Sequence, residues 1–305
     1  MIKLFQYFFI ICLPFLVACH NSDDMRNGIP KTLIIGIYSG DNPTQTKEKI
    51  APFQKYLEKE LGMPVTFFFS SDYTSLVEGM QRKKLHIAQL SPFAYVLATQ
   101  KPCLVPIAAF GINHQPTTYH SIIFVNSKSA IHSLEDVKKQ SKNLTLCFAD
   151  PASASGHLVP RAYLKSIGLD PESSFKQVVF AGSHAASIMS INSGKIDIGC
   201  STNDLALDKM VREGSVKAAD FRILWESDPI VNDAITARSD LNKDFIAKVQ
   251  KAYLEVDQKD SIAFKGSFFR YYPNPVNMQF IPIADSVYNP IRKIAYSIKE
   301  LKLIN

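Results

Sequence analysis

Cysteine and tryptophan are scarce in this chain, which has five cysteines and one tryptophan among its 305 residues. Cys12 and Cys19 stand near the start, so Cys103, Cys147 and Cys200 are the thiols of the body. Three is an odd number, which excludes a framework built only of paired disulfides. We expect buried free thiols at the last two, which lie in apolar strand-like runs, while one pair among the three stays open.

The familiar sequence motifs of catalysis and nucleotide binding are also absent. The chain has no Gly-x-Ser-x-Gly, no phosphate-binding loop of the Walker type, no Gly-x-Gly-x-x-Gly, no Cys-x-x-Cys and no His-Glu-x-x-His. Its seven histidines do not fall at metal-ligand spacing. We therefore expect no metal ion, no cofactor and a binding protein rather than an enzyme. The one catalytic alternative pairs Ser155 as nucleophile with His184 as base.

A strong excess of one charge is missing as well. The chain carries 34 lysines and arginines against 28 aspartates and glutamates, a formal net charge of +6, and the cations are thinly spread. This distribution argues against a nucleic-acid partner. The apolar content of 46% supports a real core, and the length suits one large domain or two lobes. We expect a monomer.

The most hydrophobic segment is short and lies at the N-terminus. Leu4 to Ala18 follows an early cation, Lys3, and falls short of the ~20 residues that a membrane-spanning helix needs. A charged start, an apolar centre and a small residue before a cut are typical of a secretory signal. The next residue is Cys19, in the Leu-x-Ala-Cys pattern of a bacterial lipoprotein. An ordinary signal peptide with a chance cysteine, or a membrane anchor, is the alternative.

This interpretation places the protein outside the cytosol. Residues 1–18 would be removed, and Cys19 would carry the lipid that holds the chain to a bacterial membrane, in the periplasm or on the outer face of the cell. Residues 19–30 are polar and rich in turn-forming residues, as in a flexible tether. At ~3.5 Å per residue they could reach roughly 40 Å.

Strand and helix signals alternate along the rest of the chain. We expect strands at 32–38, 65–69, 85–90, 104–110, 121–126, 144–148, 178–181 and 196–200, and helices at 46–61, 73–82, 92–99, 134–138, 158–167, 184–192, 241–257 and 285–301. Such alternation predicts an α/β architecture with largely parallel sheets that are covered on both faces.

One unit of the chain occurs twice. Ser71 to Ala88 and Gly182 to Gly199 share the same order of loop, helix, basic turn and buried strand, and the offset is 111 residues (184 − 73). Tyr73 and His184 are equivalent in this register. The repeat predicts two similar lobes, at residues 30–117 plus 222–305 and at 118–221, with hinge segments near 117–120 and 221–228.

Helix-capping sequences follow several of the expected strands. They are Ser70-Ser71-Asp72-Tyr73, Ser91-Pro92, Ser153-Ala154-Ser155-Gly156 and Gly182-Ser183-His184. Each one alone can be explained by capping. Ligands of open α/β sheets sit outside the carboxyl ends of the strands, where helix starts present unpaired N–H groups. Together they predict a site for an anion.

The segment from Asp150 to His157 is the sharpest candidate within this site. Ser153 and Ser155 offer two hydroxyl groups, and Gly156 removes a Cβ where an oxyanion would approach the backbone. No lysine or arginine lies in the segment, so the anion would be held by dipoles and uncharged donors. Further donors are the phenols of Tyr73 and Tyr119 and the imidazole of His184, each of which could also be a structural residue.

At these residues the chain resembles the phosphate-, phosphite- and phosphonate-binding lipoproteins and periplasmic proteins of ABC importers. The resemblance covers about residues 32–257. The segments that carry it are Asn42-Pro43, Ser71-Asp72-Tyr73, Leu90-Ser91-Pro92, Tyr119-His120-Ser121, Asp150-Pro151 with Ser155-Gly156, Gly182-Ser183-His184, and Ser227-Asp228-Pro229 with Asn232-Asp233. It implies a type II periplasmic-binding fold, with mixed, largely parallel sheets and a hinge, whose two lobes close on a small anionic ligand. It also implies an ABC permease and ATPase as partners.

The resemblance also implies roles for single residues. The family holds the phosphonate group with a Ser-Thr-Ser turn, a histidine and two tyrosines, which correspond here to Ser153-Ala154-Ser155, His184, Tyr73 and Tyr119. Ala154 lacks the middle hydroxyl, a loss of about 1 kcal/mol.

Members that take aminoethylphosphonate also hold the amine with carboxylates. These positions fall at Asn203, or the adjacent Asp204, and near Asp233. Because Asn203 is neutral, a small phosphorus oxyanion or a phosphonate with an uncharged tail fits at least as well. An anion sensor that signals to a membrane receptor, a protein for a different small anion, and an enzyme on the same fold stay open.

Overall fold

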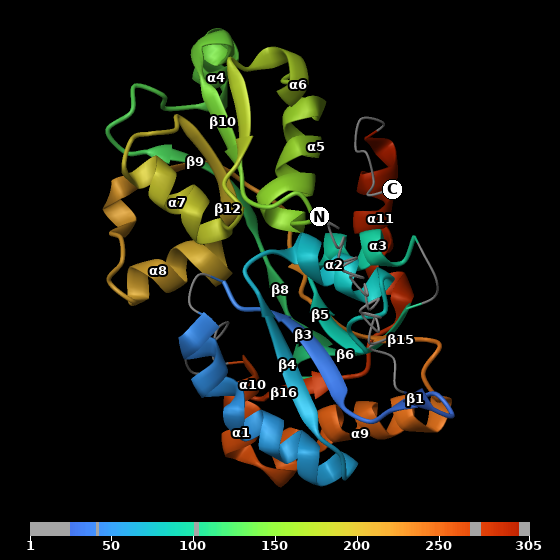
Figure 1. The fold of residues 1–305 in the computed structure, drawn as a ribbon. Helices are drawn as coiled ribbons and strands as arrows, with labels where there is room; N and C mark the ends of the chain where they lie inside the picture. The colour runs from blue at the N-terminus through green and yellow to red at the C-terminus, as the bar shows by residue number, and fades with distance from the viewer. Residues whose placement is uncertain (1–24, 41–42, 101–103, 269–275, 299–305) are drawn as a thin grey trace, which may run out of the picture.

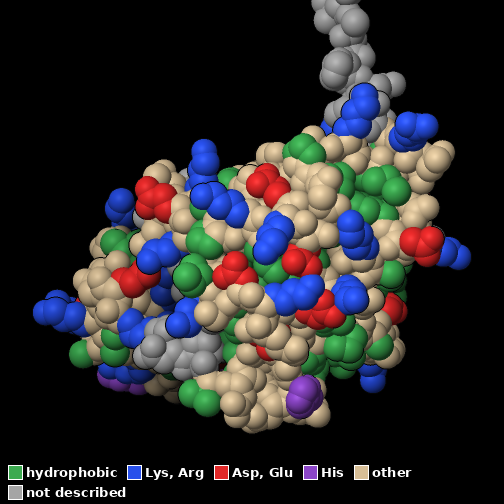
Figure 2. All heavy atoms as spheres, turned by 90° about the horizontal axis from the view of Figure 1, so that it is seen from below, with side chains coloured by type: hydrophobic (Ala, Val, Ile, Leu, Met, Phe, Trp, Pro, Cys, Tyr) green, Lys and Arg blue, Asp and Glu red, His purple; other side chains and the backbone are tan. Residues whose placement is uncertain are grey.

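The computed structural model describes residues 25–40, 43–100, 104–268 and 276–298, which form two lobes (Figure 1). The predicted signal segment, Cys19 and Cys103 lie outside the described residues. No helix in the described ranges is long and apolar enough to span a bilayer. On the face seen in Figure 2, basic and acidic side chains are interspersed.

The first lobe is built on a seven-stranded sheet with the order β16-β6-β15-β5-β3-β4, and β7 pairs with β6. The strands are β3 (Leu33–Tyr38), β4 (Val65–Ser70), β5 (Ile87–Leu90), β6 (Leu104–Ile112), β7 (Gln115–Pro116), β15 (Ala234–Arg238) and β16 (Met278–Ile281). β3 runs parallel to β4 and β5, whereas β15 enters antiparallel between β5 and β6. The sheet is therefore mixed, and its parallel pairs join β4, β3 and β5.

Helices cover both faces of this sheet, because an inner strand such as β3 is apolar on both sides. Leu33, Ile35 and Ile37 of β3 pack in one cluster, and Ile34 and Tyr38 contact the other. The first face carries α1 (Pro43–Leu61), α9 (Lys243–Lys259) and α10 (Ser261–Phe268); the second carries α2 (Tyr73–Gln81), α3 (Pro92–Ala98) and α11 (Asn289–Ser297), preceded by the 3₁₀ turn η5 (Asp285–Tyr288).

The second lobe has a five-stranded sheet with the order β11-β10-β12-β9-β13. Its strands are β9 (Ser121–Asn126), β10 (Thr145–Phe148), β11 (Gln177–Phe180), β12 (Ile198–Thr202) and β13 (Phe221–Glu226). The helices are α4 (Leu134–Gln140), α5 (Val159–Ser166), α6 (Pro171–Ser174), α7 (His184–Asn192) and α8 (Asp208–Arg212), with 3₁₀ turns η1 (Ser141–Asn143) and η4 (Ala218–Asp220). Five-residue π-helical turns, η2 (Ala154–Leu158) and η3 (Asn203–Leu207), precede α5 and α8.

The internal repeat is a repeat of topology. The order β4-β3-β5-β15-β6 in the first lobe matches β11-β10-β12-β9-β13 in the second. In both, the first three strands are parallel, the fourth is antiparallel to the third, and the fifth is antiparallel to the fourth. Tyr73 and His184 are the first residues of the equivalent helices α2 and α7. The prediction of two lobes built on one helix–strand unit is confirmed.

Two short strands, β8 (Thr118–Tyr119) and β14 (Ile230–Val231), form an antiparallel pair where the chain crosses between the lobes. The sequence-based boundary at residue 222 assigns the segment after it to the first lobe. This is a correction, because β13 pairs with β9 in the second sheet as far as Glu226. The return crossing therefore follows Glu226.

The described end of the predicted tether is ordered. β1 (Met25–Arg26) pairs with β2 (Ile29–Pro30) in a tight hairpin. Asn27 and Gly28 both have positive φ, as a two-residue hairpin turn requires. The Gly28 carbonyl accepts the backbone N–H of Asn242 at 2.9 Å, which fixes the hairpin beside the start of α9.

The two described cysteines are buried free thiols, as expected. In the register of β10 and β12, Cys147 lies beside Gly199. Cys200 is the next residue of β12, so its side chain points to the opposite face of the sheet from that of Cys147. Burial raises the pKa of both thiols.

Candidate functional site

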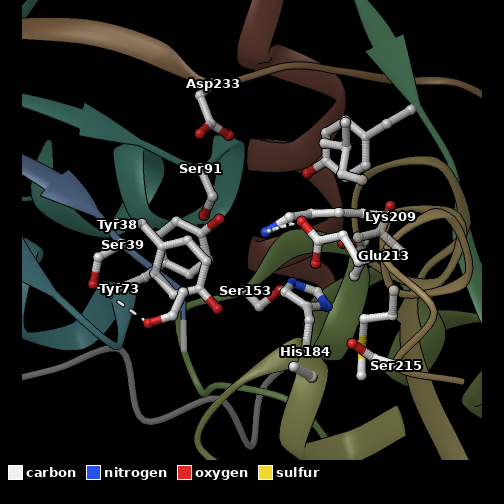
Figure 3. A pocket seen from close by; sticks show the side chains of 18 of the residues that line it. Tyr38, Ser39, Tyr73, Ser91, Ser153, His184, Lys209, Glu213, Ser215 and Asp233 are labelled. Atoms are coloured by element: carbon white, nitrogen blue, oxygen red, sulfur yellow. Dashed lines mark hydrogen bonds and ion pairs between the residues drawn. The ribbon is translucent and has the colours of Figure 1, made fainter. Parts of the chain in front are cut away.

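A cavity of about 300 Å³ lies between the lobes (Figure 3), a size within the usual range of small-molecule sites. The sequence-predicted residues that line it are Tyr73, Tyr119, Ser153, Ser155, His184 and Asp233. The lining also includes Tyr38, Ser39, Gly40, Gln45, Ser91, Ala185, Thr202, Leu205, Ala206, Lys209, Met210, Glu213 and Ser215. Both lobes and the crossing strand β8 therefore contribute to one site.

Four helical segments begin at this cavity with a capping side chain. The N–H groups of Ser75, Ala94, Gly156 and Ala186 donate to the side chains of Asp72 (2.7 Å), Ser91 (3.3 Å), Ser153 (3.0 Å) and Ser183 (3.1 Å). These caps confirm the helix starts that the sequence predicts. Their convergence directs four positive helix-dipole ends at one volume without a formal charge in the serine turn itself.

The serine turn between β10 and α5 is fixed by one backbone hydrogen bond within it and by one from the side chain of Ser121. The N–H of Leu158 donates to the Ser153 carbonyl at 3.1 Å, and the Ser121 hydroxyl donates to the Ser155 carbonyl at 2.6 Å. A Cβ at Gly156 would lie 2.5 Å from the Ala149 Cβ. Gly156 does not line the cavity, so packing requires the glycine rather than the approach of a ligand.

His184 lies between two serine hydroxyls. Its Nε2 is 3.2 Å from Ser153 Oγ and its Nδ1 is 3.1 Å from Ser201 Oγ. Burial lowers the pKa of His184 to about 4, so the imidazole is neutral at neutral pH. A neutral imidazole donates from one nitrogen and accepts at the other.

The first lobe presents an aromatic pair to the cavity. The rings of Tyr38 and Tyr73 stack with centroids 4.4 Å apart, and Tyr119 of β8 lies on the lining as well. Tyr38 is absent from the sequence-based prediction. Its signal was its place at the end of β3, because ligand sites gather at the carboxyl ends of strands.

Asp233 brings a buried carboxyl to the first-lobe side of the cavity. It immediately precedes β15, and the side-chain amide of Gln89 donates to it at 3.1 Å. The structure does not bring Asn203 and Asp204 to the cavity, since neither is among the described lining residues. The Asn203 amide donates to Glu226 at 3.0 Å, and Asp204 accepts the backbone N–H of His120 at 2.8 Å.

Ala154 also lies behind the lining. It is fully buried in the apolar cluster that α2 and α3 share with the start of η2. Its backbone remains part of the serine turn, but its Cβ packs against the first lobe.

The sequence-based prediction missed the part of the cavity wall that is formed by α8 and the residues after it. Lys209, Met210, Glu213 and Ser215 all line the cavity. On the sequence, charges on a short helix indicate only a solvated surface. The sequence-based prediction also missed Thr202, although the repeat offset of 111 residues makes it the equivalent of Ser91.

The lobes also touch beside the cavity. The Ser91 hydroxyl donates to the Ala152 carbonyl at 3.1 Å. Asp150 is buried at the end of β10, facing the first turn of α2. Burial and the charge of Asp72 raise the pKa of Asp150 to about 7, although N–H groups of Ala152 and Tyr73 favour its charged form. Among the described residues, no group of three or more His, Cys, Asp or Glu side chains is arranged to hold a metal ion.

Comparisons with known proteins agree with this architecture. A family model described as an ABC transporter, phosphonate, periplasmic substrate-binding protein matches residues 35–267. The chain is 28% identical over 251 residues to the phosphate-import protein PhnD of Mycolicibacterium smegmatis, covering 78% of this chain and 77% of the relative. It is 30% identical over 213 residues to the phosphonates-binding periplasmic protein of Escherichia coli, covering 70% and 62%.

Solved structures show the same fold. A binding protein of an ABC phosphonate transporter from Pseudomonas aeruginosa superposes with a TM-score of 0.76 at 24% identity, covering 86% of this chain and 85% of the other. PhnD1 of Prochlorococcus marinus, in complex with methylphosphonate, gives a TM-score of 0.74 at 24% identity, covering 88% and 98%.

Proposed function

Since this chain belongs to the periplasmic substrate-binding proteins of phosphonate ABC transporters, we propose that it binds a small phosphorus oxyanion or phosphonate between its lobes and delivers it to a membrane permease. The observation that carries the proposal is the junction of Ser153, Ser155 and His184 from one lobe with Tyr73 from the other on one cavity.

The hydrogen bonds around His184 can leave one proton directed at a ligand. The Ser201 hydroxyl can donate to Nδ1, so that Nε2–H donates to Ser153 Oγ. The N–H of Gly156 donates to the same oxygen. Both lone pairs of Ser153 are then used, and its hydroxyl hydrogen is available for the oxyanion. This chain of donors supports an anion without placing a charge on the imidazole.

Closure of the lobes completes the site and excludes water, which strengthens hydrogen bonds to the ligand. A ligand shifts the protein to the closed form only through its higher affinity for that form. The permease would then bind the closed form, and the partner ATPase would supply the energy of transport. No catalytic step is needed for this role.

A thermal-shift series tests the proposal. We expect phosphate, phosphite or methylphosphonate to raise the melting temperature of the mature protein, because a ligand of the folded state stabilises it by mass action. Sulfate and acetate serve as anion controls. A shift with the controls alone, or with none of the anions, would contradict the proposed ligand class.

We also propose that Cys19 is lipidated and anchors the protein outside the cytosol. The support is the Leu-x-Ala-Cys pattern at the end of the apolar segment. Expression of the full chain in bacteria fed with labelled palmitate should label the protein, and Cys19→Ala should abolish the label. Equal labelling of both proteins would refute the anchor.

A further inference from the structure

One buried hydroxyl on the cavity wall lacks a hydrogen-bond partner. Thr202 lies at the end of β12, is 3% exposed and lines the cavity. Its Oγ1 has no partner within the described part of the chain. Burial of an unpaired hydroxyl is costly, and such groups are rare in folded proteins. Because Thr202 lines the ligand cavity, a ligand that enters as the lobes close can supply the partner that this buried hydroxyl lacks.

The same wall supplies a positive charge. Lys209 of α8 lines the cavity, and Figure 3 shows its chain running inward, with its ammonium between the labelled first-lobe residues and His184 in this view. Within the described part of the chain it forms an ion pair with Glu213, in which the ammonium and carboxylate are 3.8 Å apart. That separation exceeds the usual length of a charge-assisted hydrogen bond. The pair is therefore loose, and the ammonium can turn to a ligand at little cost.

From these two observations we propose that Thr202 and Lys209 form a second set of contacts to the bound oxyanion. The charge of Lys209 then selects oxyanions with two negative charges, such as phosphonates, over singly charged sulfonates of similar shape. This inference rests on the proposed function. The serine cradle and the neutral His184 can donate to either ligand class, because phosphonates and sulfonates both present three oxygen atoms in the same tetrahedral arrangement.

The cavity wall carries both negative and positive side chains, which is why the selection between dianions and monoanions would depend on one lysine. Asp233 and Glu213 also line the cavity, and both repel an anion. Lys209 offsets this repulsion, more for a dianion than for a monoanion, because the Coulomb energy scales with the ligand charge. Glu213 competes with the ligand for the ammonium, so removal of its charge should tighten anion binding.

Calorimetry with methylphosphonate and methanesulfonate tests the charge selection, at a mildly alkaline pH where the phosphonate carries two charges. We expect Lys209→Met to weaken methylphosphonate binding about tenfold or more and methanesulfonate binding, where measurable, by a smaller factor. Glu213→Gln should tighten methylphosphonate binding. Lys195→Met, which removes an exposed lysine beyond the end of α7, controls for the net charge and should change neither affinity.

Equal losses for both ligands in Lys209→Met, or no loss, would overturn the inference. So would weaker phosphonate binding in Glu213→Gln. If the wild-type protein binds no phosphorus oxyanion at all, the proposed function itself fails. If the wild type binds methylphosphonate and Lys209→Met binds it equally well, only the present inference fails.

Thr202→Val tests the hydroxyl by two readouts of opposite sign. The variant keeps the shape of the side chain and removes the unpaired oxygen, so the ligand-free protein should melt at a higher temperature than the wild type. Its affinity for methylphosphonate should fall about fivefold, the size of one ordinary hydrogen bond. A ligand-free melting temperature below that of the wild type, or an unchanged affinity, would refute the contact.

Discussion

The buried carboxyl of Asp150 should make the stability of this protein depend on pH. Asp150 is 2% exposed, follows β10 in the second lobe and faces the first turn of α2 in the first. Burial, together with the nearby charge of Asp72, raises its pKa from 3.8 to about 7. Near neutral pH the folded protein therefore buries a partly charged group at the junction of its lobes.

The sign follows from proton linkage. The unfolded chain has the ordinary pKa of 3.8, so between about pH 4 and pH 7 the folded state binds a proton that the unfolded state has lost. The contribution to the free energy of unfolding is full below pH 4 and is lost as the pH rises through 7. The rise of the pKa from 3.8 to about 7 corresponds to at most about 4 kcal/mol.

Two buried histidines act in the opposite direction over the same range. Burial lowers the pKa of His184 from 6.5 to about 4. Burial and the charge of Arg161 lower that of His157 from 6.5 to about 3. Their contribution is present above pH 6.5 and is lost as the pH falls toward these values. Between about pH 4 and pH 6.5 the two histidines together outweigh Asp150, so the wild-type profile alone does not report on the carboxyl. Only a difference between the wild type and a variant without the carboxyl isolates Asp150.

Asp150→Asn provides that difference, because it keeps the shape and the acceptor for the Ala152 N–H (2.7 Å in the wild type) without a titrating group. Urea unfolding followed by circular dichroism gives the free energy of unfolding of both proteins. We expect the variant to be more stable by about 2–4 kcal/mol near pH 8 and nearly equal near pH 4. Asp228→Asn, at an exposed carboxyl, should show no such trend.

Two results would refute this reasoning. One is a difference between Asp150→Asn and the wild type that does not change with pH, since the effect would then be a matter of packing. The other is a variant that is less stable near pH 8, which would mean that the charged carboxylate is a net stabilising partner of α2.

Three further substitutions probe the serine turn. His184→Ala removes the partner of Ser153 and should weaken phosphonate binding at least about tenfold in calorimetry; an unchanged affinity in a folded variant would exclude the imidazole from the site. Gly156→Ala should lower the free energy of unfolding by about 1–3 kcal/mol in urea titrations, because the new Cβ overlaps Ala149; equal stability would show that the turn can relax. Ala154→Thr should leave phosphonate affinity unchanged and lower the melting temperature, because it buries a hydroxyl in an apolar cluster; tighter binding would show that this position faces the ligand.

The sequence was sufficient where the signals are local or repeated. Helix starts at Tyr73 and His184 were predictable because a capping residue precedes each one, and the offset between the two copies revealed the two lobes. The strand Ser121–Asn126 was predictable because it is an apolar run bounded by polar residues.

Long-range pairing could not be read in the same way. Ala234–Arg238 is a five-residue segment with one large apolar side chain, Ile235. It becomes a central strand only because it pairs with β5 and β6, more than a hundred residues earlier. The wall of α8 was hidden for a related reason. Whether Lys209 faces solvent or a cavity depends on the opposite lobe, which no local pattern describes.

The repeat explains how two lobes of the same topology can form a site whose two sides differ. Equivalent positions carry Tyr73 and His184, Ser91 and Thr202, and Asp72 and Ser183. The backbone of both copies brings helix starts to the cavity, which suits any anion. The side chains then divide the work, with an aromatic pair from the first lobe and the serine and imidazole donors from the second. On the proposed function neither half holds a complete set of contacts, so affinity for the ligand would arise only when the lobes meet, and that dependence would couple binding to closure.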